Sequence, residues 1–485
     1  MSSSIRTLKL VLLFLGAVLV SGSAWAQDTQ QPQAPEGPAR PKPAARGIPG
    51  INDPNATAED NEGQTANWRQ DTAPVTGLES PTLGSPELGH SYWVPGLEYG
   101  STIESRSLGQ PSSSGWYADN YIGGQGSLLE AWSRSQLGLN YSGGGYFTTD
   151  SLRNNGTFHQ LSLAQNLNLR RWQIQFFDYF SYIPESEFGF AGGTNLAVPG
   201  VSGTLGPVVP GLGASIVPNQ SIYSAIGPRY SNAAAAQTTY LLSPRSSITV
   251  GGSYGLLRFT ESGNVDNDMA LGSAGFNYVV SRDDSVGISY RFAGYHFAGQ
   301  PQALASHTVS FVYNRKIVRK VALDLFGGPQ ITNFRVPIAS ATRNVGLSAG
   351  ASLKYGTRHG TMELSYFHGL TGGSGLLLGS NTDQATAGLS RQLGRVWSGN
   401  VFFGYARNGA LVAITGTPEP SFDDWFVGAG ISRPFGRNVN FAVSYTDKFE
   451  NATPPVCTGA TCSSSYRQNM ISITLQWRAR PLVLR

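Results

Sequence analysis

The feature that most constrains the fold is an alternation of apolar with small or polar residues, which recurs from about residue 95 to residue 477. In the last segment the apolar positions are Ile471, Ile473, Leu475 and Trp477, and the positions between them hold Ser, Thr and Gln. Side chains on a β-strand point alternately to opposite faces, so this period of two predicts strands with one apolar face each.

Short turns that contain arginine divide these strands into pairs. Arg245, Arg282 and Arg319 are spaced by 37 residues, and Arg358 and Arg395 follow after a further 39 and 37. A tilted transmembrane strand takes about 9–11 residues, so the spacing is typical of two such strands, a short turn and a medium loop. The eight predicted hairpins have strands near 119–131/134–148, 156–168/171–183, 230–242/246–258, 269–280/285–297, 304–315/319–331, 344–355/360–370, 382–393/396–407 and 422–433/437–449. A first strand near 96–106 and a last near 466–477 give 18, with 16 as the alternative.

The connections at the other ends of the strands are longer and rich in Gly, Asn, Asp, Pro and Ser. Short periplasmic turns and long extracellular loops are typical of outer-membrane barrels. An even number of strands then places both ends of the barrel in the periplasm. The longer connections are predicted near 107–118, 149–155, 184–229, 259–268, 298–303, 332–343, 371–381, 408–421 and 450–465.

Composition distinguishes a membrane barrel from a soluble β-sheet protein. Charged residues make up only 13% of the chain, against roughly 25% in an average soluble domain. The non-apolar face is mostly Ser, Thr, Gly, Asn and Gln, and aromatic residues such as Trp172, Tyr290 and Trp425 lie near predicted strand ends. Aromatic girdles at the two membrane surfaces explain that placement. We therefore predict an all-β fold, a transmembrane antiparallel β-barrel over residues 95–477.

The N-terminus predicts export from the cytoplasm. Arg6 and Lys9 precede an apolar run over 10–20, and a small-residue motif ends at Ala26. This order is typical of a secretory signal peptide, here residues 1–26. The formal net charge is +4, and loss of the two basic residues leaves +2. So small a charge does not favour nucleic acid as a partner.

Residues 27–90 differ from the rest of the chain, because they are rich in Pro, Ala and Gln and have no hydrophobic period. A segment of this composition cannot bury enough apolar surface to offset the entropy cost of ordering. We expect a mostly disordered periplasmic tail. It either contacts peptidoglycan or a periplasmic partner, or acts only as a solvated tether.

The two cysteines, Cys457 and Cys462, lie close together in a Pro/Thr/Ser-rich segment. A close pair in an exported chain predicts a small disulfide loop. A metal site is the alternative, although neither His nor an acidic residue lies between them.

The face opposite the apolar one gives the predicted composition of the lumen. Its charged residues have both signs and lie far apart in the sequence, whereas a strongly ion-selective pore would concentrate one sign. The remainder is mainly Ser, Thr, Asn and Gln, which suits neutral polar solutes, sugars included. Alternatively, the charges pair within a hydrated interior and have no selective role. The predicted lumen charges are Arg291, Asp324, Lys354, Glu363, Asp424 and Lys448.

Two Gly-x-Ser-x-Gly sequences, centred on Ser253 and Ser348, match the nucleophile motif of hydrolases. That motif requires a sharp turn from strand to helix. Both copies lie within alternating strands, so we expect small lumen residues at these positions. We predict neither enzymatic activity nor a cofactor.

The longest connection, 184–229, is rich in Gly, Pro and Val and nearly uncharged. Loops of this length are usually functional or disordered. We hypothesise that it folds into the barrel mouth and narrows it. The alternative is a flexible surface loop or a binding patch for an extracellular partner.

With its signal peptide, its array of hairpins and Trp477 near the end of the last strand, the chain resembles the general porin-like outer-membrane β-barrels of bacteria. The resemblance covers about 95–477 and is architectural. Many such barrels end on an aromatic residue, whereas here a periplasmic extension, 478–485, follows. The resemblance implies a channel in the outer membrane, surrounded by its lipid, for passive diffusion of small hydrophilic solutes. The alternative is a structural or secretion-linked barrel, such as an outer-membrane component associated with polysaccharide export.

Overall fold

A computed structural model gives the fold over most of the region that alternates. The residues it describes belong to one compact unit, Arg46–Arg485. A second unit, Met1–Ala45, lies outside the described residues, as do the predicted signal peptide and tail. The described ranges are 91–107, 115–149, 155–183, 229–260, 266–281, 283–318, 321–338, 341–357, 360–372, 377–394, 396–411, 421–436, 438–458 and 461–484.

Strands account for nearly all of these residues. Eighteen long strands and one short strand are present in the described ranges, and no helix there is long and apolar enough to cross a membrane. The strands are β1 (Tyr92–Ser107), β2 (Gly115–Ala131), β3 (Ser135–Thr148), β4 (Gly156–Asn168), β5 (Trp172–Ile183), β6 (Arg229–Ser243), β7 (Ser246–Phe259), β8 (Asn267–Val279), β9 (Asp284–Phe297), β10 (Ala303–Val318), β11 (Val321–Ile338), β12 (Ala341–Thr357), β13 (Gly360–Thr371), β14 (Ser380–Gln392), β15 (Ser398–Ala410), β16 (Ser421–Phe435), β17 (Val439–Thr458), β18 (Thr461–Arg478) and β19 (Leu482–Val483).

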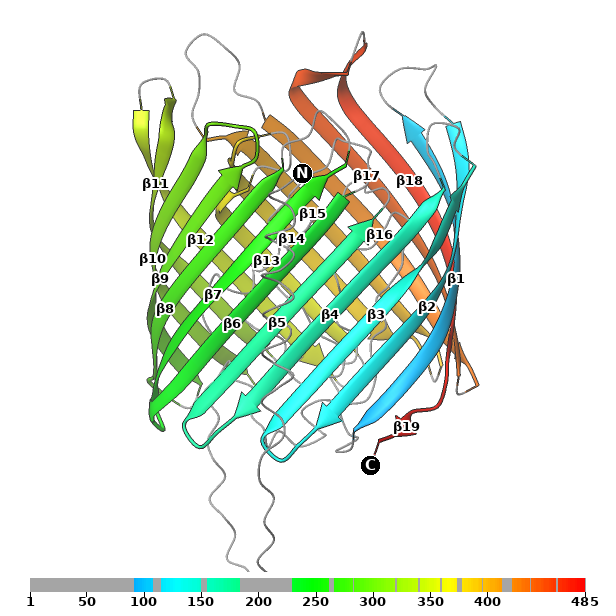
Figure 1. The fold of residues 1–485 in the computed structure, drawn as a ribbon, viewed down its shortest axis with the longest axis horizontal. Helices are drawn as coiled ribbons and strands as arrows, with labels where there is room; N and C mark the ends of the chain where they lie inside the picture. The colour runs from blue at the N-terminus through cyan, green and yellow to red at the C-terminus, as the bar shows by residue number, and fades with distance from the viewer. Residues whose placement is uncertain are drawn as a thin grey trace, which may run out of the picture. The chain divides into compact units, whose positions relative to one another are not determined.

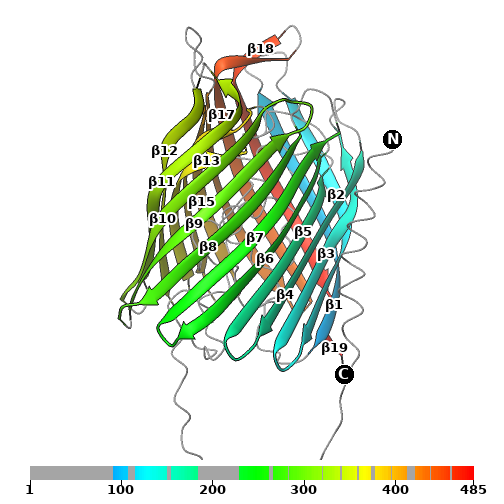
Figure 2. The same ribbon diagram turned by 60° about the vertical axis from the view of Figure 1, so that its left-hand side comes forward.

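The long strands close into a barrel, as Figures 1 and 2 show. Each strand from β2 to β18 pairs antiparallel with the preceding strand, and β1 pairs with both β2 and β18. The closing pair runs in register from Gly96 opposite Arg478 to Ser107 opposite Arg467. The prediction of an 18-stranded antiparallel barrel is therefore confirmed, and the alternative of 16 strands is excluded.

The C-terminal extension 478–485 continues along the start of β1. Leu482 and Val483 form β19 and pair with Trp93 and Tyr92. Backbone amides of Ala479 and Leu484 donate to the carbonyl oxygens of residues 95 and 91. The residues that follow Trp477 thus lengthen the closing seam at the end of the barrel where the chain terminus lies (Figure 1).

Two of the predicted loops, 332–343 and 450–465, are largely strand, and these predictions were wrong. β11 and β12 are joined through residues 339–340 and β17 and β18 through residues 459–460, so both hairpins rise beyond the neighbouring strands (Figure 1). The pairing register shifts between Asn333 and Ile338 in the first hairpin and between Asn451 and Val456 in the second, where the alternation of the sequence is interrupted. Backbone pairing continues there although the alternation stops, because a strand outside the lipid does not need an apolar face.

The two faces of each strand have opposite chemistry. On β18, Ile471 and Ile473 are 44% and 46% exposed on the outer surface, whereas Ser472 and Thr474 are 6% and 8% exposed on the inner face. The same alternation of exposed and buried positions runs along β9 and β10. An apolar exterior and a polar interior reverse the arrangement of a soluble protein, and they are what a barrel in the outer membrane requires.

A ring of tyrosines lies on the outer surface, about midway along the strands that carry them. Each tyrosine belongs to a strand that runs toward the loops. Its hydroxyl group reaches a polar side chain on the following strand, two residues nearer the loops than the residue directly opposite the tyrosine. These hydrogen bonds give polar groups a partner on a surface that is otherwise apolar. The hydrogen bonds are Tyr99–Asn120 (3.3 Å), Tyr141–His159 (2.9 Å), Tyr290–His307 (2.8 Å), Tyr366–Asp383 (2.8 Å), Tyr405–Asp423 (2.9 Å) and Tyr445–Asn469 (2.9 Å).

One carboxylate lies on the outer face, where most side chains are apolar. Asp178 lies in the middle of β5 on the outer face, where its neighbours along the strand, Phe176 and Phe180, are apolar. Its Oδ1 accepts a hydrogen bond of 2.9 Å from Nδ2 of Asn232 on β6. A charge at this depth on a lipid-facing surface is unfavourable, and the amide only partly compensates for it.

Replacing the pair together (D178L/N232L) is expected to raise the free energy of unfolding by about 1–2 kcal/mol, somewhat less than the 2–4 kcal/mol cost of a basic residue at the bilayer midplane. Urea unfolding in phosphatidylcholine vesicles, followed by tryptophan fluorescence, measures the change. The matched control is Asp324→Leu, which removes a carboxylate from the inner face and should give no gain. A double variant no more stable than the unmodified protein would contradict the lipid-facing placement of Asp178.

Candidate functional site

The inner wall of the barrel is the candidate site, and hydroxyl and amide groups coat much of it. Gln330 Nε2 donates to Ser306 Oγ at 2.9 Å, and Thr382 Oγ1 donates to Asn408 Oδ1 at 2.6 Å. These bonds link neighbouring strands, so the polar coat is fixed to the wall. An ordered polar surface can hydrogen-bond to water or to hydroxylated solutes.

The serines of the two hydrolase-like motifs belong to this coat. Ser253 lies within β7 and Ser348 within β12, and both side chains are buried on the inner face. Both strands continue past the motif without the strand-to-helix turn that a nucleophile needs. Within the described ranges, no group of three or more His, Cys, Asp or Glu side chains could hold a metal ion.

Three of the predicted lumen charges, distant in sequence, come together on β11, β12 and β13. Lys354 lies directly opposite position 363, which is Glu, and Asp324 is diagonal to Lys354 because its own partner is Ser352. Residues on one face of adjacent strands at these positions are within reach of one another. The register therefore places Asp324 and Lys354 diagonally across from each other on one face.

Two more predicted lumen charges lie on neighbouring strands. Asp424 on β16 is opposite Glu450, and Lys448 is two residues earlier on β17, on the same face. Arg291 on β9 is instead flanked by Ser273 and Thr308 and is almost fully buried.

Sequence reasoning missed four inner-face acids: Glu98, Glu104, Asp119 and Glu450. Their side chains are 2%, 0%, 0% and 4% exposed. The first two alternate with the apolar positions of β1, so the same period of two indicated them. Asp119 is the first residue of a predicted strand and Glu450 lies in a predicted loop. At such positions the alternation does not indicate which face a side chain points to.

These acids, together with Asp424, form a band across β16, β17, β18, β1 and β2, which we call the acidic band. Its links across the closing seam include Gln468 Nε2 to Glu104 Oε2 at 2.7 Å and Thr102 Oγ1 to Ser472 Oγ at 2.9 Å. Tyr121 donates to Glu98 Oε1 at 3.2 Å. The band therefore includes strands from both ends of the chain. Its members are Glu98, Glu104, Asp119, Asp424 and Glu450.

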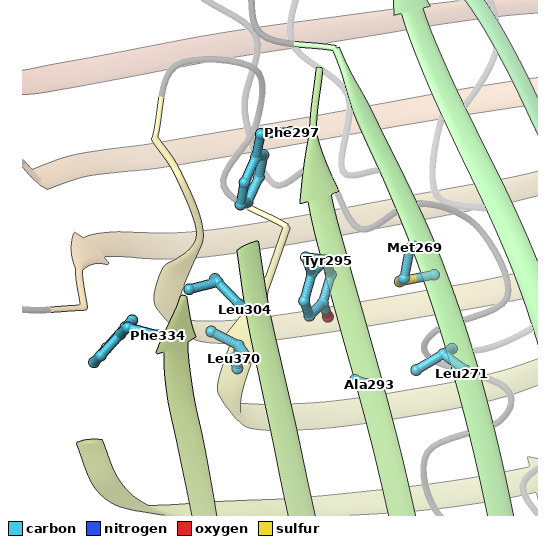
Figure 3. Close-up of a cluster of buried hydrophobic side chains, with 8 residues drawn as sticks. All are labelled: Met269, Leu271, Ala293, Tyr295, Phe297, Leu304, Phe334 and Leu370. Atoms are coloured by element: carbon cyan, nitrogen blue, oxygen red, sulfur yellow. The ribbon is translucent and has the colours of Figure 1, made fainter. Parts of the chain in front are cut away.

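An apolar cluster lies on the facing wall, and Figure 3 shows its side chains on β8 to β11 and at the end of β13. β10 is nine strands from β1 in either direction around the ring, so the cluster and the acidic band are on opposite sides. Apolar residues here break the rule that such residues face outward. The cluster consists of Met269, Leu271, Ala293, Tyr295, Phe297, Leu304, Phe334 and Leu370.

Aromatic rings elsewhere on the wall lie flat against glycines of the adjacent strand. A Cβ atom at Gly100 would overlap the ring of Tyr121, and one at Gly428 would overlap Phe402. Glycine lets the backbone accept a ring at this distance. These rings therefore stack against the wall over adjacent strands.

A closed barrel of 18 antiparallel strands with an apolar outer face, a tyrosine ring and a polar lumen defines a porin-like transmembrane β-barrel of the outer-membrane type. No protein-family model and no curated protein matches the chain.

Among solved structures, those similar to the chain at low identity include the following three. Acinetobacter baumannii OccAB4 is 8% identical, with a TM-score of 0.42 over 81% of this chain and 100% of that chain. Pseudomonas aeruginosa OpdL is 11% identical, with a TM-score of 0.41 over 81% and 100%. Pseudomonas aeruginosa OpdK, solved with vanillate, is 9% identical, with a TM-score of 0.41 over 80% and 99%. Similarity this low transfers neither a solute nor a residue role.

Proposed function

We propose that the protein is a channel for passive diffusion of small hydrophilic solutes across the outer membrane. The observation that carries the proposal is the closed ring of 18 strands with a polar inner wall. Side chains can fill an eight-stranded barrel, whereas barrels of about 16–18 strands leave an aqueous channel. No feature of the described strands specifically favours the structural or polysaccharide-export alternative.

Single-channel recording tests this proposal. The mature protein, refolded and inserted in a planar lipid bilayer, is expected to give stable, stepwise openings because water fills a lumen of this width. Sugars added to one side should then reduce the current if neutral solutes enter. Circular dichroism and protease resistance identify folded, inserted protein. Silence from protein that passes both checks would contradict a diffusion channel and favour a scaffolding role.

The longest connection is the proposed constriction of this channel. Residues 184–228 lie outside the described residues, so the proposal depends on the composition of the segment and on its position between β5 and β6. An apolar loop of this length would be unfavourable in water and favourable against the apolar cluster inside the mouth.

Deletion of residues 190–225 is expected to raise the single-channel conductance, because the narrowest part of the pore would widen. The same bilayer recordings measure it. A matched control replaces the segment with a Gly/Ser linker of equal length, which keeps the chain length but removes the apolar residues. Unchanged conductance in the deletion variant would rule out a constricting loop.

We also propose a disulfide between the two cysteines. The register sets Cys457 on β17 directly opposite Cys462 on β18. Opposed residues of an antiparallel pair have Cα atoms about 4.5–5.5 Å apart, and disulfides span roughly 4.4–6.8 Å. This separation supports a cross-strand bond at the tip of the projecting hairpin.

Mass spectrometry after alkylation of the unfolded, unreduced protein is expected to show no modified cysteine, and reduction first should expose both. The control is the C457S/C462S variant, which should fold equally well because the bond closes only a short loop. Alkylation of both cysteines without reduction, in protein that was exported and isolated from the outer membrane, would refute the bond.

Two further proposals concern residues outside the described ranges. Residues 1–26 remain a predicted signal peptide, and residues 27–90 a predicted periplasmic tail, which is either a solvated tether or a contact for peptidoglycan or a periplasmic partner. Their composition supports the signal peptide and the tail.

A further inference from the structure

Two carboxylates of the acidic band face each other across a strand pair. Asp424 of β16 is directly opposite Glu450 of β17, and their side chains are 2% and 4% exposed. Neither oxygen of Asp424 has a hydrogen-bond partner, and Oε2 of Glu450 has none either, within the part of the chain that the structure describes. Three acceptor atoms are thus buried together without a donor.

Two opposed, buried carboxylates are unfavourable unless a positively charged group binds between them. Opposed residues have Cβ atoms about 4.5–5.5 Å apart, so two ionised carboxylates there repel each other. A buried polar group without a partner carries its full desolvation cost. A bound cation removes both penalties, because it supplies the missing charge and the missing donors.

The neighbouring charges do not cancel the excess. Lys448 lies on the same face two residues from Glu450, and position 106 of β1, an arginine, is opposite Gln468 at the same level. Against these two basic positions the acidic band has five carboxylates. Asp423 points to the outer face, where it accepts a hydrogen bond of 2.9 Å from Tyr405. The inner wall here therefore has an excess of negative charge.

We propose that Asp424 and Glu450 form a binding subsite in the channel wall for the ammonium or guanidinium group of a cationic solute. This inference rests on the proposed channel function and names its preferred solute class. An ammonium has three N–H donors and a guanidinium five, enough for the three unpartnered oxygens. A calcium ion takes 6–8 oxygen ligands, which two carboxylates do not provide.

The subsite also predicts selectivity of the whole channel. Acids of one sign concentrated on one wall of a pore attract cations and repel anions. Asp424 is the fourth residue of β16, counted from the loop end, so solutes meet it near the mouth. The proposal adds a preference for cations to a channel for small hydrophilic solutes.

Reversal potentials in a potassium chloride gradient test the selectivity. The unmodified channel is expected to favour K⁺ over Cl⁻, and D424N/E450Q to lower the permeability ratio about three- to tenfold, because negative charge is lost from the inner wall. The matched control is D423N, which removes the same charge one residue away on the outer face and should leave the ratio unchanged. Both variants should fold, since removing a buried repulsion does not destabilise the wall.

A binding measurement separates this proposal from the channel function. Saturation-transfer NMR with agmatine, which carries a guanidinium and an ammonium, is expected to show binding to the folded barrel in detergent. The signal should be lost in D424N/E450Q and kept in D423N. If no variant conducts but this pattern holds, the channel function fails and the cation subsite stands. Equal agmatine signals in all three proteins, or equal losses in both variants, would overturn the subsite.

Discussion

Closure of the backbone hydrogen-bond network is the constraint on which the rest of this structure depends. A membrane offers no water to unpaired N–H and C=O groups, so a sheet can enter it only if it has no free edge. The pairing of β1 with β18, from Gly96 opposite Arg478 onward, removes both edges at once. β19 extends the same seam over Trp93, and no other contact between the chain ends is needed to explain the ring.

Closure also decides what each face of a strand meets. Once the ring exists, alternate residues belong either to lipid or to the lumen, and a single pattern of period two serves both. Ile473 and Thr474 are adjacent in sequence, but the first side chain is on the lipid-facing surface and the second is on the inner face. Asp178, a carboxylate on the lipid side, and the apolar cluster around Tyr295, on the lumen side, are departures from this division.

The number of strands and the direction of most side chains were predictable, because both follow from local alternation and turn spacing. The contacts between inner-face residues of different strands were harder to predict. Asp424 and Glu450 are 26 residues apart, and Glu104 joins Gln468 only because the ring closes, so no local pattern reveals their proximity. The hairpin around Glu450 was also misread as a loop, since alternation ends where the lipid ends while backbone pairing continues.

The position of the acidic band has a consequence for assembly. Its strands are the first two and the last three of the ring, so the band is complete only after the seam between β1 and β18 has formed. A ligand that binds only the closed form stabilises that form by mass action. Cations that contact carboxylates on both sides of the seam therefore make its opening less favourable as their concentration rises, whereas the Asp424–Glu450 subsite, on the adjacent strands β16 and β17, does not depend on the seam.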